Sequence, residues 1–472
     1  MSLQPIKQSK WTNFPGNYRV AEVKEIAKWI LPGESGVVIG GSGSGKSNIA
    51  GYIANRPDVI NQYLPKSIDD YYIIHFDANT LPVVTTVAFY RSLLYTLATL
   101  FESDDELTAK LSAIVEKAQK SDDSLSQYFA LQQAHKVILA SSNKNIVWLL
   151  DRFDNCCTEL DTGVLNSLRH LRDQFKDRLS YVAFTRFPLS RLRNPRTYSE
   201  LYDLLIMHTC WVGPMTSTDS RWVAHQVEMR YSQKLDEFQI NTLFQLCGGS
   251  PTFLKLACTA LVQGKLEKSD RPNVWLLKLL ELESIQESCR ELWATLSTEE
   301  QLILKECLSS SESDTQESQQ SKPVSINRKQ TNYLEGIGVL DSHLHFLSRI
   351  FEEFVRRQGG QTPENISIQN HIVYRGSLPL TEQPTPTEFR VLECLLFYTD
   401  AGYANFTQLY RYVYPHEKLE SNDIQHDMKQ KLAQQVGRLN KKLTKGLEPE
   451  WEYVQNRRTA GYQLVQPSPA AN

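Results

Sequence analysis

The residues best suited to chemistry lie near the start of the chain, in a run of small residues that ends in Lys-Ser. This run follows an apolar stretch and fits the spacing GxxxxGK[ST], which is typical of a phosphate-binding loop (P-loop). Glycine lets consecutive backbone N–H groups turn toward phosphate oxygens, and the lysine can reach the β- and γ-phosphates. The hydroxyl after the lysine can bind Mg²⁺, and the positive end of the following helix favours an anion. We therefore predict a nucleotide site made by Gly40, Gly41, Ser42, Gly43, Ser44, Gly45, Lys46, Ser47 and Asn48.

A magnesium ion at such a loop needs a carboxylate from a second strand. The apolar run 146–150 ends at Asp151, which we predict to be this carboxylate (the Walker B aspartate) and a metal ligand together with Ser47. Asp154 has two interpretations, because it could position the attacking water or serve as a helix cap or turn residue. The expected cofactors are ATP or ADP and Mg²⁺.

A third candidate pair follows the next apolar run, which ends in Thr185-Arg186. Ligands of open α/β sheets bind at the carboxyl ends of the strands, so this hydroxyl and guanidinium would face the γ-phosphate. A guanidinium can fork onto phosphate oxygens and so report whether the γ group is present. We predict Asp151, Asp154 and Arg186 as catalytic residues and Thr185 as a nucleotide contact.

Alternating strands and helices would position these residues. Apolar runs at 36–39, 72–76, 146–150 and 181–184 predict strands buried on both faces, with helical patterns between them. That order predicts a parallel sheet with helices on both faces. From about residue 206 the pattern becomes helical, and a Gly-Gly-Ser-Pro break at 248–251 opens another helix.

Together these motifs resemble the STAND class of signal-transduction NTPases, which includes the NACHT and NB-ARC regulators. The resemblance rests on the P-loop, on residues 149–154 against the class pattern hhhDGhDE, and on Thr185-Arg186 at the place of the class's sensor. Residues 249–251 look like the GxP motif that opens a lid helix. In the class this proline packs near the adenine and a winged helix follows, which implies an adenine contact at Pro251 and a winged helix at 291–358.

Two departures from the class pattern bear on activity. Asn155 stands where the class has an acidic residue, and the upstream pattern hhGRxxE survives only as residues 18–22, so hydrolysis is expected to be slow or absent. A neighbouring interpretation is an AAA+ initiator of the origin-recognition type. Its Walker B usually reads Asp-Glu and its sensor strand usually ends in Asn. This chain has Asp151-Arg152 and Thr185-Arg186, so this interpretation ranks second.

The C-terminal residues 366–466 resemble the winged-helix DNA-binding domain of OmpR/PhoB-type response regulators. Residues 368–380 correspond to the leading strands, and 385–392 to the first helix, with the pattern LTxxEfxlL. Residues 436–443 correspond to the recognition helix, and 453–464 to the wing, a hairpin that ends in Gly-Tyr. The resemblance covers the whole domain in the correct order and implies binding to double-stranded DNA.

The charges of this domain agree with that resemblance. Six basic residues and no acid lie between 429 and 445, and Leu432, Val436, Leu439 and Leu443 recur at helical spacing toward a core. The outward residues can then read base edges or contact phosphate. Basic and acidic residues are nearly balanced over the whole domain, so a winged helix that contacts proteins stays open. The predicted DNA contacts are Gln434, Gln435, Arg438, Lys441, Lys442, Arg457 and Arg458.

Composition limits the remaining possibilities. The net charge of −3 confines any nucleic-acid site to a local patch, and no apolar run of about 18 residues predicts a membrane span. The N-terminus lacks the apolar core of a signal peptide, and the eight cysteines form no CxxC pair, which favours free thiols in the cytoplasm.

The predicted fold class is an α/β P-loop NTPase followed by a helical lid and two winged-helix domains. We predict a nucleotide-binding domain at 1–205, a lid at 206–290, a winged helix at 291–358, a linker at 359–365 and a DNA-binding winged helix at 366–466. The leading functional hypothesis is an ATP-binding, nucleotide-switched DNA-binding regulator with a protein signal or partner and nucleotide-dependent self-association. The alternatives are a DNA-handling ATPase for replication, transposition or defence, and a nucleotide-binding scaffold that contacts proteins.

Overall fold

The chain divides into two compact units, Met1–Phe351 and Glu352–Asn472. The computed structural model describes residues 10–30, 32–63, 70–101, 105–267, 271–313, 328–358, 365–369, 371–376, 378–380, 382–399, 402–417, 426–445, 452–457 and 460–466. The predicted linker at 359–365 falls outside these ranges except for its last residue, and so does the predicted DNA contact Arg458.

A five-stranded parallel sheet forms the centre of the first unit. Its strand order is β2-β3-β4-β1-β5, so β4 lies between the strand that precedes the P-loop and the strand that ends in Asp151. All four predicted strands are confirmed. The fifth was not predicted, because it is only three residues long, and it extends the sheet past residue 205. The strands are β1 (Gly36–Ile39), β2 (Tyr71–Asp77), β3 (Asn145–Asp151), β4 (Leu179–Thr185) and β5 (Thr209–Trp211).

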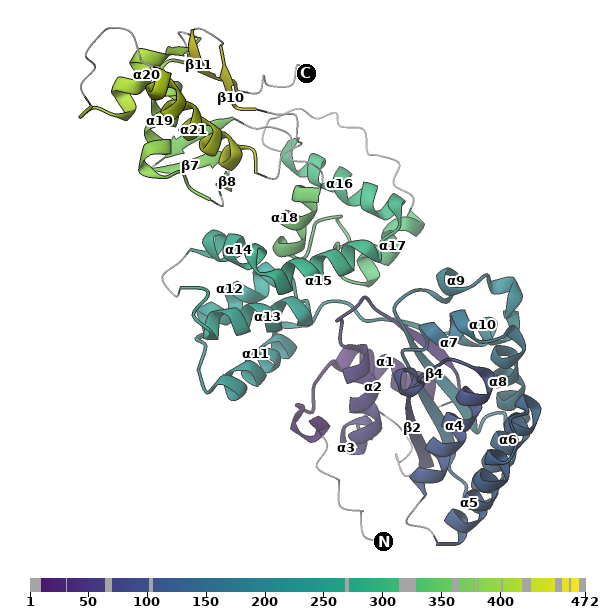
Figure 1. Ribbon diagram of the computed structural model, residues 1–472. Coiled ribbons are helices and arrows are strands. Elements are labelled where there is room, and N and C mark those ends of the chain that lie inside the picture. Colours follow the sequence, from purple (N-terminus) through teal and green to yellow (C-terminus); the bar gives the residue numbers. More distant parts are fainter. Residues whose placement is uncertain are drawn as a thin grey trace. The chain divides into compact units, whose positions relative to one another are not determined.

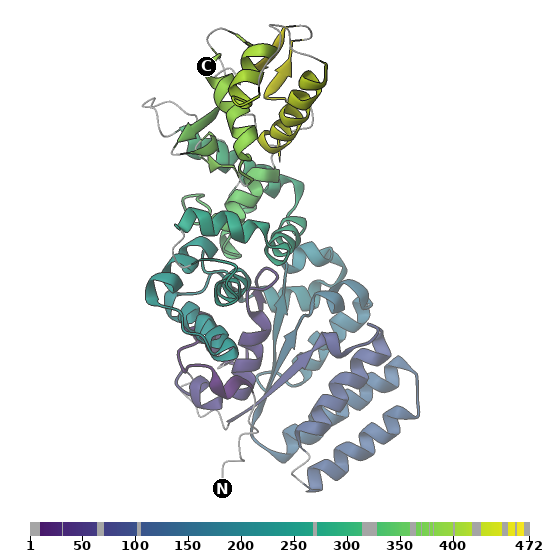
Figure 2. The ribbon, with the colours of Figure 1, turned by 60° about the vertical axis from the view of Figure 1, so that its left-hand side comes forward.

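Helices cover both faces of this sheet, as the sequence predicts (Figure 1). In Figure 2 the purple helices near the N-terminus and the blue helices of residues 86–141 lie on opposite sides of the strands. One face carries η1 (Lys10–Asn13), α1 (Val20–Ile30), α2 (Lys46–Asn55) and α3 (Pro57–Ile60). The other carries α4 (Thr86–Leu100), α5 (Asp105–Gln119), α6 (Ser124–Ser141), α8 (Thr162–Gln174) and α10 (Ser199–Ile206).

Strand residues alternate between these two layers, which is why the strands read as continuous apolar runs. Val38 and Val147 face α1 and α2, whereas Val37 and Trp148 face the layer of α4, α6 and α8. The alternation places successive residues of β3 in different cores and makes every position of that strand from Ile146 onward buried. Short elements connect the layers: η3 (Ala78–Thr80), α7 (Asp154–Glu159), α9 (Leu189–Leu192) and η4 (Pro195–Thr197).

Beyond the sheet, the rest of the first unit is helical. Helix α11 starts with a capping box in which Thr216 and Asp219 each accept the other's backbone N–H. Helix α13 starts at Pro251, where a proline costs no hydrogen bond, and the Ser250 side chain caps it. The helices are α11 (Ser217–Tyr231), α12 (Glu237–Cys247), α13 (Pro251–Val262), α14 (Pro272–Glu281) and α15 (Glu283–Ala294).

The segment predicted as the first winged helix, 291–358, holds mainly helices in its described part. These are α16 (Thr298–Ser313), α17 (Arg328–Gly336) and α18 (Arg349–Gln358). A single isolated bridge pairs Leu340 with Phe346 between α17 and α18. The boundary between the two compact units falls inside α18. No helix in the described part of the chain is both long and apolar enough to cross a bilayer.

The second unit has two three-stranded antiparallel sheets around a helical core. The first sheet has the order β6-β7-β8, and the second has β10-β11-β9. Gly461 begins β11 with a φ of 151°, and a Cβ there would lie 2.0 Å from the carbonyl oxygen of Ala404, so glycine permits the close pairing of β11 with β9. The elements are β6 (Ile366–Gln369), β7 (Ile372–Arg375), β8 (Leu378–Pro379), α19 (Pro386–Phe397), β9 (Ala404–Asn405), α20 (Phe406–Val413), α21 (His426–Leu443), β10 (Val454–Asn456) and β11 (Gly461–Leu464).

Candidate nucleotide-binding site and basic helix face

The P-loop joins β1 to α2 in the conformation that its glycines require. Gly43 has a φ of 71° and Gly45 a φ of 98°, and both values lie in the left-handed region that favours glycine. Helix α2 begins at Lys46, and no side chain caps its first turn. Its N-terminal N–H groups are therefore available to a bound anion.

The Lys46 ammonium lies inside this loop. It donates hydrogen bonds to the carbonyl oxygens of Gly40 and, at 3.0 Å, of Gly41. Loss of hydration lowers the pKa of Lys46 to about 8, although the nearby Asp154 carboxylate acts in the opposite direction. A group that carries several negative charges in the loop would restore the charged form. The lysine is thus held by main-chain carbonyls at the position where a phosphate would replace them.

Asp151 ends β3 with its side chain almost fully buried, at 1% exposure. Neither carboxylate oxygen accepts a hydrogen bond of normal geometry from the described residues, although the side chains of His75 and Ser47 are close enough to favour its charged form. The His75 Nε2 atom lies 3.6 Å from Oδ2, which is too long for a hydrogen bond. Burial alone would raise the pKa of Asp151, but His75, Ser47 and Arg152 together lower it below its usual value. These neighbours keep the buried carboxylate ionised, and its oxygens keep lone pairs that a bound metal could use.

These residues fit a magnesium ion that is shared with phosphate. Mg²⁺ is usually bound by one or two protein oxygens, by phosphate and by water rather than by a cage of protein ligands. Among the described residues no cluster of three or more histidine, cysteine or carboxylate side chains could hold a metal alone. The open oxygens of Asp151 and the nearby Ser47 hydroxyl supply what the shared arrangement needs.

The structure brings Asp154 and Arg186 together, but through the backbone. Asp154 starts α7, and its Oδ1 accepts the backbone N–H of Arg186 at 2.7 Å. Burial raises the pKa of Asp154, an effect that this hydrogen bond and Lys46 partly oppose. The Arg186 side chain is exposed. Asp154 therefore fixes the turn after β4, whichever of its two predicted roles applies.

Thr185 differs from the expectation that its hydroxyl faces the γ-phosphate. The residue is buried, and its Oγ1 donates to the carbonyl oxygen of Phe187 at 2.8 Å. The backbone turns back at the end of β4, so the nearest acceptor is local. Its own carbonyl accepts the N–H of Gly40 at 3.2 Å, which ties the end of β4 to the start of the P-loop. The side chain of Asn48, the last predicted loop residue, forms a hydrogen bond with the Tyr18 hydroxyl.

Pro251 lies beside the P-loop, in the lining of a pocket. The pocket is bordered by the loop, by residues after β5, by parts of α13 and α15 and by the residues after α17, including Gly41, Ser44, Pro214, Pro251, Leu292 and Ile337. Next to Pro251, the Thr252 hydroxyl donates to the Gly43 carbonyl at 3.3 Å. On the loop itself the Ser42 hydroxyl donates to Glu291 Oε1 at 2.5 Å. Helices α13 and α15 thus both contact the loop directly.

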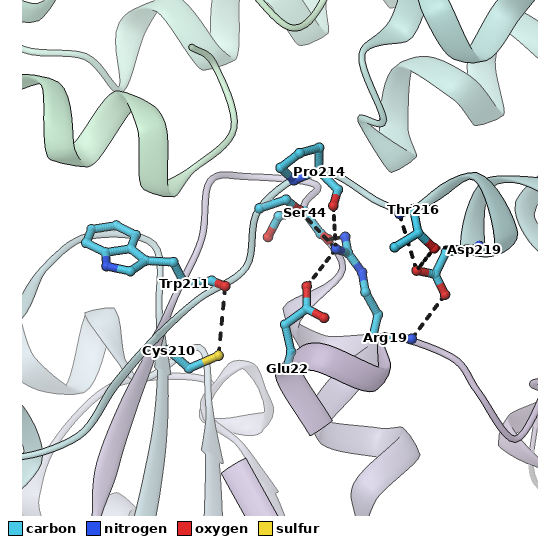
Figure 3. Close-up of polar contacts among 9 residues, drawn as sticks. Arg19, Glu22, Ser44, Cys210, Trp211, Pro214, Thr216 and Asp219 are labelled. Carbon is cyan, nitrogen blue, oxygen red and sulfur yellow. Dashed lines mark hydrogen bonds and ion pairs between the residues drawn. The ribbon is translucent and has the colours of Figure 1, made fainter. Parts of the chain in front are cut away.

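The most connected residue of the site is Arg19, which sequence reasoning noted only as a remnant of the hhGRxxE pattern. Its Nη2 donates to the Ser44 carbonyl at 2.8 Å, and its Nη1 donates to Glu22 at 2.8 Å (Figure 3). Nη1 also donates to the carbonyls of Gly213 at 3.0 Å and Pro214 at 3.2 Å. A fully buried guanidinium requires such partners.

The backbone of Arg19 extends this network to helix α11. Arg19 has a φ of 49°, and its N–H donates to Asp219 Oδ1 at 3.0 Å, in the capping box of α11 (Figure 3). One residue therefore joins the P-loop, the segment after β5 and helix α11. The signal in the sequence was an arginine just before the first helix, with Glu22 three residues on, and its other partners, 25 to 200 residues away, carry no local pattern.

On the second unit, α21 presents a basic face. Arg438, Lys441 and Gln434 are exposed, Gln435 is half-buried, and the described residues include no acidic partner for either cation. Lys442 differs from the prediction that it points outward, because it lies 2.8 Å from the buried Glu388 carboxylate of α19. It follows Lys441 on the side of the helix that packs against α19, where only 15% of its side chain is exposed. On the hairpin, Arg457 Nε donates to Gln463 at 2.6 Å.

Comparison with known proteins gives partial matches. A family model described as Nephrocystin 3, N-terminal, matches residues 20–186, well under half of the chain. The matched segment contains the P-loop, Asp151 and Arg186 and ends with the turn after β4. No curated protein sequence matches. With the strand order and the loop geometry, this places the first unit in the α/β P-loop NTPase fold.

Solved structures share the fold only loosely. The Walker-type ATPase PABY2304 of Pyrococcus abyssi is 12% identical with a TM-score of 0.44, over 73% of this chain and 99% of that one. The ORC1 protein of Aeropyrum pernix, solved in complex with DNA, is 13% identical with a TM-score of 0.33, over 68% and 84%. Domain III of the Thermotoga maritima replication initiation protein DnaA is 16% identical with a TM-score of 0.33, over 59% and 100%. All three scores are below 0.5, so the site is interpreted from its own residues.

Proposed function

We propose that this chain is an ATP-binding, slowly hydrolysing switch of the STAND type that regulates DNA binding by its C-terminal domain. The observation that carries the nucleotide part is the buried Asp151 carboxylate beside the P-loop, whose two oxygens accept no hydrogen bond of normal geometry from the described residues. A structural acid would be paired, whereas an acid that waits for a metal–phosphate ligand has free lone pairs. The N-cap of α2, Gly45, has no side chain that could cap the first turn, which supports the same interpretation.

Each residue of the site then has a physical role. The loop N–H groups and Lys46 would bind the β- and γ-phosphates, and Ser47 and Asp151 would hold Mg²⁺. The metal would neutralise charge on the phosphates when it is bound. Asp154 fixes the backbone of Arg186, so that its exposed guanidinium can approach the γ-phosphate. Asn155 cannot accept a proton as a carboxylate would, which supports slow hydrolysis.

The contacts around the loop support a switch. The side chains of Thr252 and Glu291 bond to the P-loop, and Arg19 joins it to the lid. A nucleotide that rearranges the loop would therefore change the contacts of helices α11, α13 and α15. Such a change would shift the balance between closed and open arrangements of the lid and alter what the C-terminal domain, a protein partner or a second copy can bind.

The exposed face of α21 supports DNA as a partner. Arg438 and Lys441 have no acidic partner among the described residues, so both charges are available to phosphates. Gln434 lies on the same exposed side and can read adenine edges. The element order of this unit, with leading strands, three helices and a terminal hairpin, supports the resemblance to OmpR/PhoB-type domains. A cytoplasmic location follows from this proposal rather than from the fold.

The test measures nucleotide and DNA binding with the full chain. Calorimetry with ATP and ADP, with and without Mg²⁺, should give binding that magnesium strengthens. Labelled duplex DNA is then titrated with the protein in ATP, in ADP or without nucleotide. A DNA affinity that depends on the nucleotide would support the regulator. Fast hydrolysis stimulated by DNA would instead indicate a DNA-handling ATPase, and no DNA retention would indicate a scaffold. The absence of nucleotide binding would end the proposal.

A further inference from the structure

The residue directly after Asp151 adopts a backbone conformation that does not suit its type. Arg152 has a φ of 54°, in the left-handed region where the Cβ of an L-residue crowds the following carbonyl oxygen. Glycine adopts this conformation freely, and asparagine or aspartate can offset it with a local hydrogen bond. Arginine has neither advantage. Strain of this kind within a binding site points to a role for the side chain.

The Arg152 side chain is held loosely at the carboxyl edge of the sheet. Its Nη1 lies 3.6 Å from Oδ2 of Asp77, the last residue of β2, which pairs in register with Asp151. The two side chains are 43% and 31% exposed. An exposed ion pair at this distance contributes little to stability and exchanges readily for a better partner. The guanidinium is therefore available.

Two cations of the first-unit site, Arg19 and Lys46, are placed differently from Arg152, whereas Arg186 is exposed as Arg152 is. Arg19 is buried, with its guanidinium bonded to one carboxylate and three carbonyls, and Lys46 bonds to the loop. Arg152, on the other hand, directly follows Asp151 in the chain, and its side chain is exposed. Strands β3 and β1 are two strand spacings apart, about 10 Å, so phosphates in the loop would lie between them.

We propose that Arg152 is a ligand of the terminal phosphate of a nucleoside triphosphate and leaves Asp77 when the triphosphate binds. The inference rests on the proposed nucleotide site and names a residue that discriminates ATP from ADP. A guanidinium forks onto phosphate oxygens in two parallel hydrogen bonds, and a diphosphate lacks the group that it would bind. Asp77 holds the side chain near the site until then.

Arg152→Gly separates this role from a structural one. The substitution removes the charge and also relieves the backbone strain, so the full chain should melt at the wild-type temperature or above it. Loss of a charge-assisted phosphate contact should weaken ATP binding about tenfold, while ADP binding stays unchanged. Both affinities are measured by calorimetry with Mg²⁺.

Asp177→Gly is the matched control. Asp177 is exposed, has a φ of 68° and precedes β4, at the edge of the sheet opposite to the nucleotide site. It should leave the chain folded and the ratio of ATP to ADP affinity unchanged. Arg152→Gln serves as a second variant, since it removes the charge but keeps a side chain at the strained position, and it should show the same loss of ATP affinity.

The outcomes separate the inference from the proposed function. If wild type binds both nucleotides and either folded Arg152 variant keeps the wild-type ratio, Arg152 is not a phosphate ligand. The inference is also overturned if both variants lose ATP and ADP equally, because a γ-phosphate contact affects only ATP. If the wild-type chain binds neither nucleotide, the proposed function fails first. Selective loss of ATP in both variants, with the Asp177→Gly ratio unchanged, supports the assignment.

Discussion

Two buried acids, one in each unit, have opposite surroundings. Asp151 and Glu388 are only 1% and 2% exposed. The Glu388 carboxylate accepts the N–H of Thr385 at 2.8 Å and the Lys442 ammonium at 2.8 Å, whereas Asp151 accepts no hydrogen bond of normal geometry from the described residues. Glu388 is complete within the protein, and Asp151 is not. The comparison distinguishes an acid that stabilises a fold from one that awaits a ligand.

The same distinction applies to the lysines. Lys442 is fixed by Glu388, while Lys46 is held only by carbonyl oxygens in a loop shaped for phosphate. If the comparison is sound, substitutions in the first unit should affect binding more than stability. Substitution of Glu388 or Lys442 in the second unit should affect stability more than binding.

The largest effect is expected from Lys46→Ala. Removal of the one ammonium in the loop should weaken nucleotide binding at least about 100-fold, because charge-assisted contacts to two phosphates are lost. The C-terminal unit should keep its fold, which its own thermal transition in the full chain would reveal. Wild-type ATP affinity in calorimetry would contradict both the site and the comparison.

DNA binding provides the next test. Arg438→Ala with Lys441→Ala should lower the slope of log affinity against log salt by about two units and weaken binding at low salt at least tenfold. Lys442→Ala is the control, since its charge is already paired, and it should leave the slope nearly unchanged while lowering stability. Fluorescence anisotropy over a salt series measures the DNA affinity and its salt slope for each variant. An equal change in slope for the control would mean that Lys442 leaves Glu388 for DNA.

Nucleotide affinity should depend on pH through Lys46. The pKa of about 8 lies below the usual value, so the unliganded fold disfavours the ammonium, and the stability of the empty protein should rise as pH passes from about 8 toward 10.5. Phosphates favour the ammonium, so affinity should be full below pH 8 and fall roughly tenfold by pH 9. Lys46→Arg, which stays charged, should give a flat profile in the same calorimetric series.

The smallest effects concern stability. Glu388→Gln should destabilise the C-terminal unit by about 1–2 kcal/mol, because it keeps the capping box but removes the charge that pairs with Lys442 and leaves that ammonium without its main partner. Asp151→Asn should lower the melting temperature without nucleotide only slightly, because neighbouring groups hold the pKa of this carboxylate below its usual value and so favour its charge in the fold. It should also abolish the effect of Mg²⁺ on nucleotide binding. If scanning calorimetry showed a marked loss of stability for Asp151→Asn, Asp151 would be a structural acid like Glu388, and the proposed difference between the two acids would be wrong.

The sequence predicted the parts of the site that depend on local spacing. The strand before the P-loop, its glycines and the strand that ends in Asp151 are each continuous in the chain, so their patterns indicate both fold and chemistry. β5 was too short to give a periodic signal. The contacts that Arg19 makes with Ser44, Gly213 and Asp219 bring together segments far apart in sequence. Such contacts follow only from the fold.

Helical periodicity was also too coarse to sort neighbouring charges. It indicated that α21 has a basic face, and Arg438 and Lys441 are exposed. It could not show that Lys442, one residue further, faces a carboxylate on α19, because that partner lies 54 residues away. The Thr185 hydroxyl escaped prediction for a related reason, since its acceptor depends on how the chain turns after β4.

The contacts of Thr252 and Glu291 with the P-loop have a kinetic consequence. These two side chains join the helices α13 and α15 directly to the loop that would hold the phosphates. Entry and departure would then both require the two helices to loosen, and the dwell time of a nucleotide would reflect how often they do so. We expect the release of the nucleotide, more than the chemical step, to set how long the protein stays in its nucleotide-bound state.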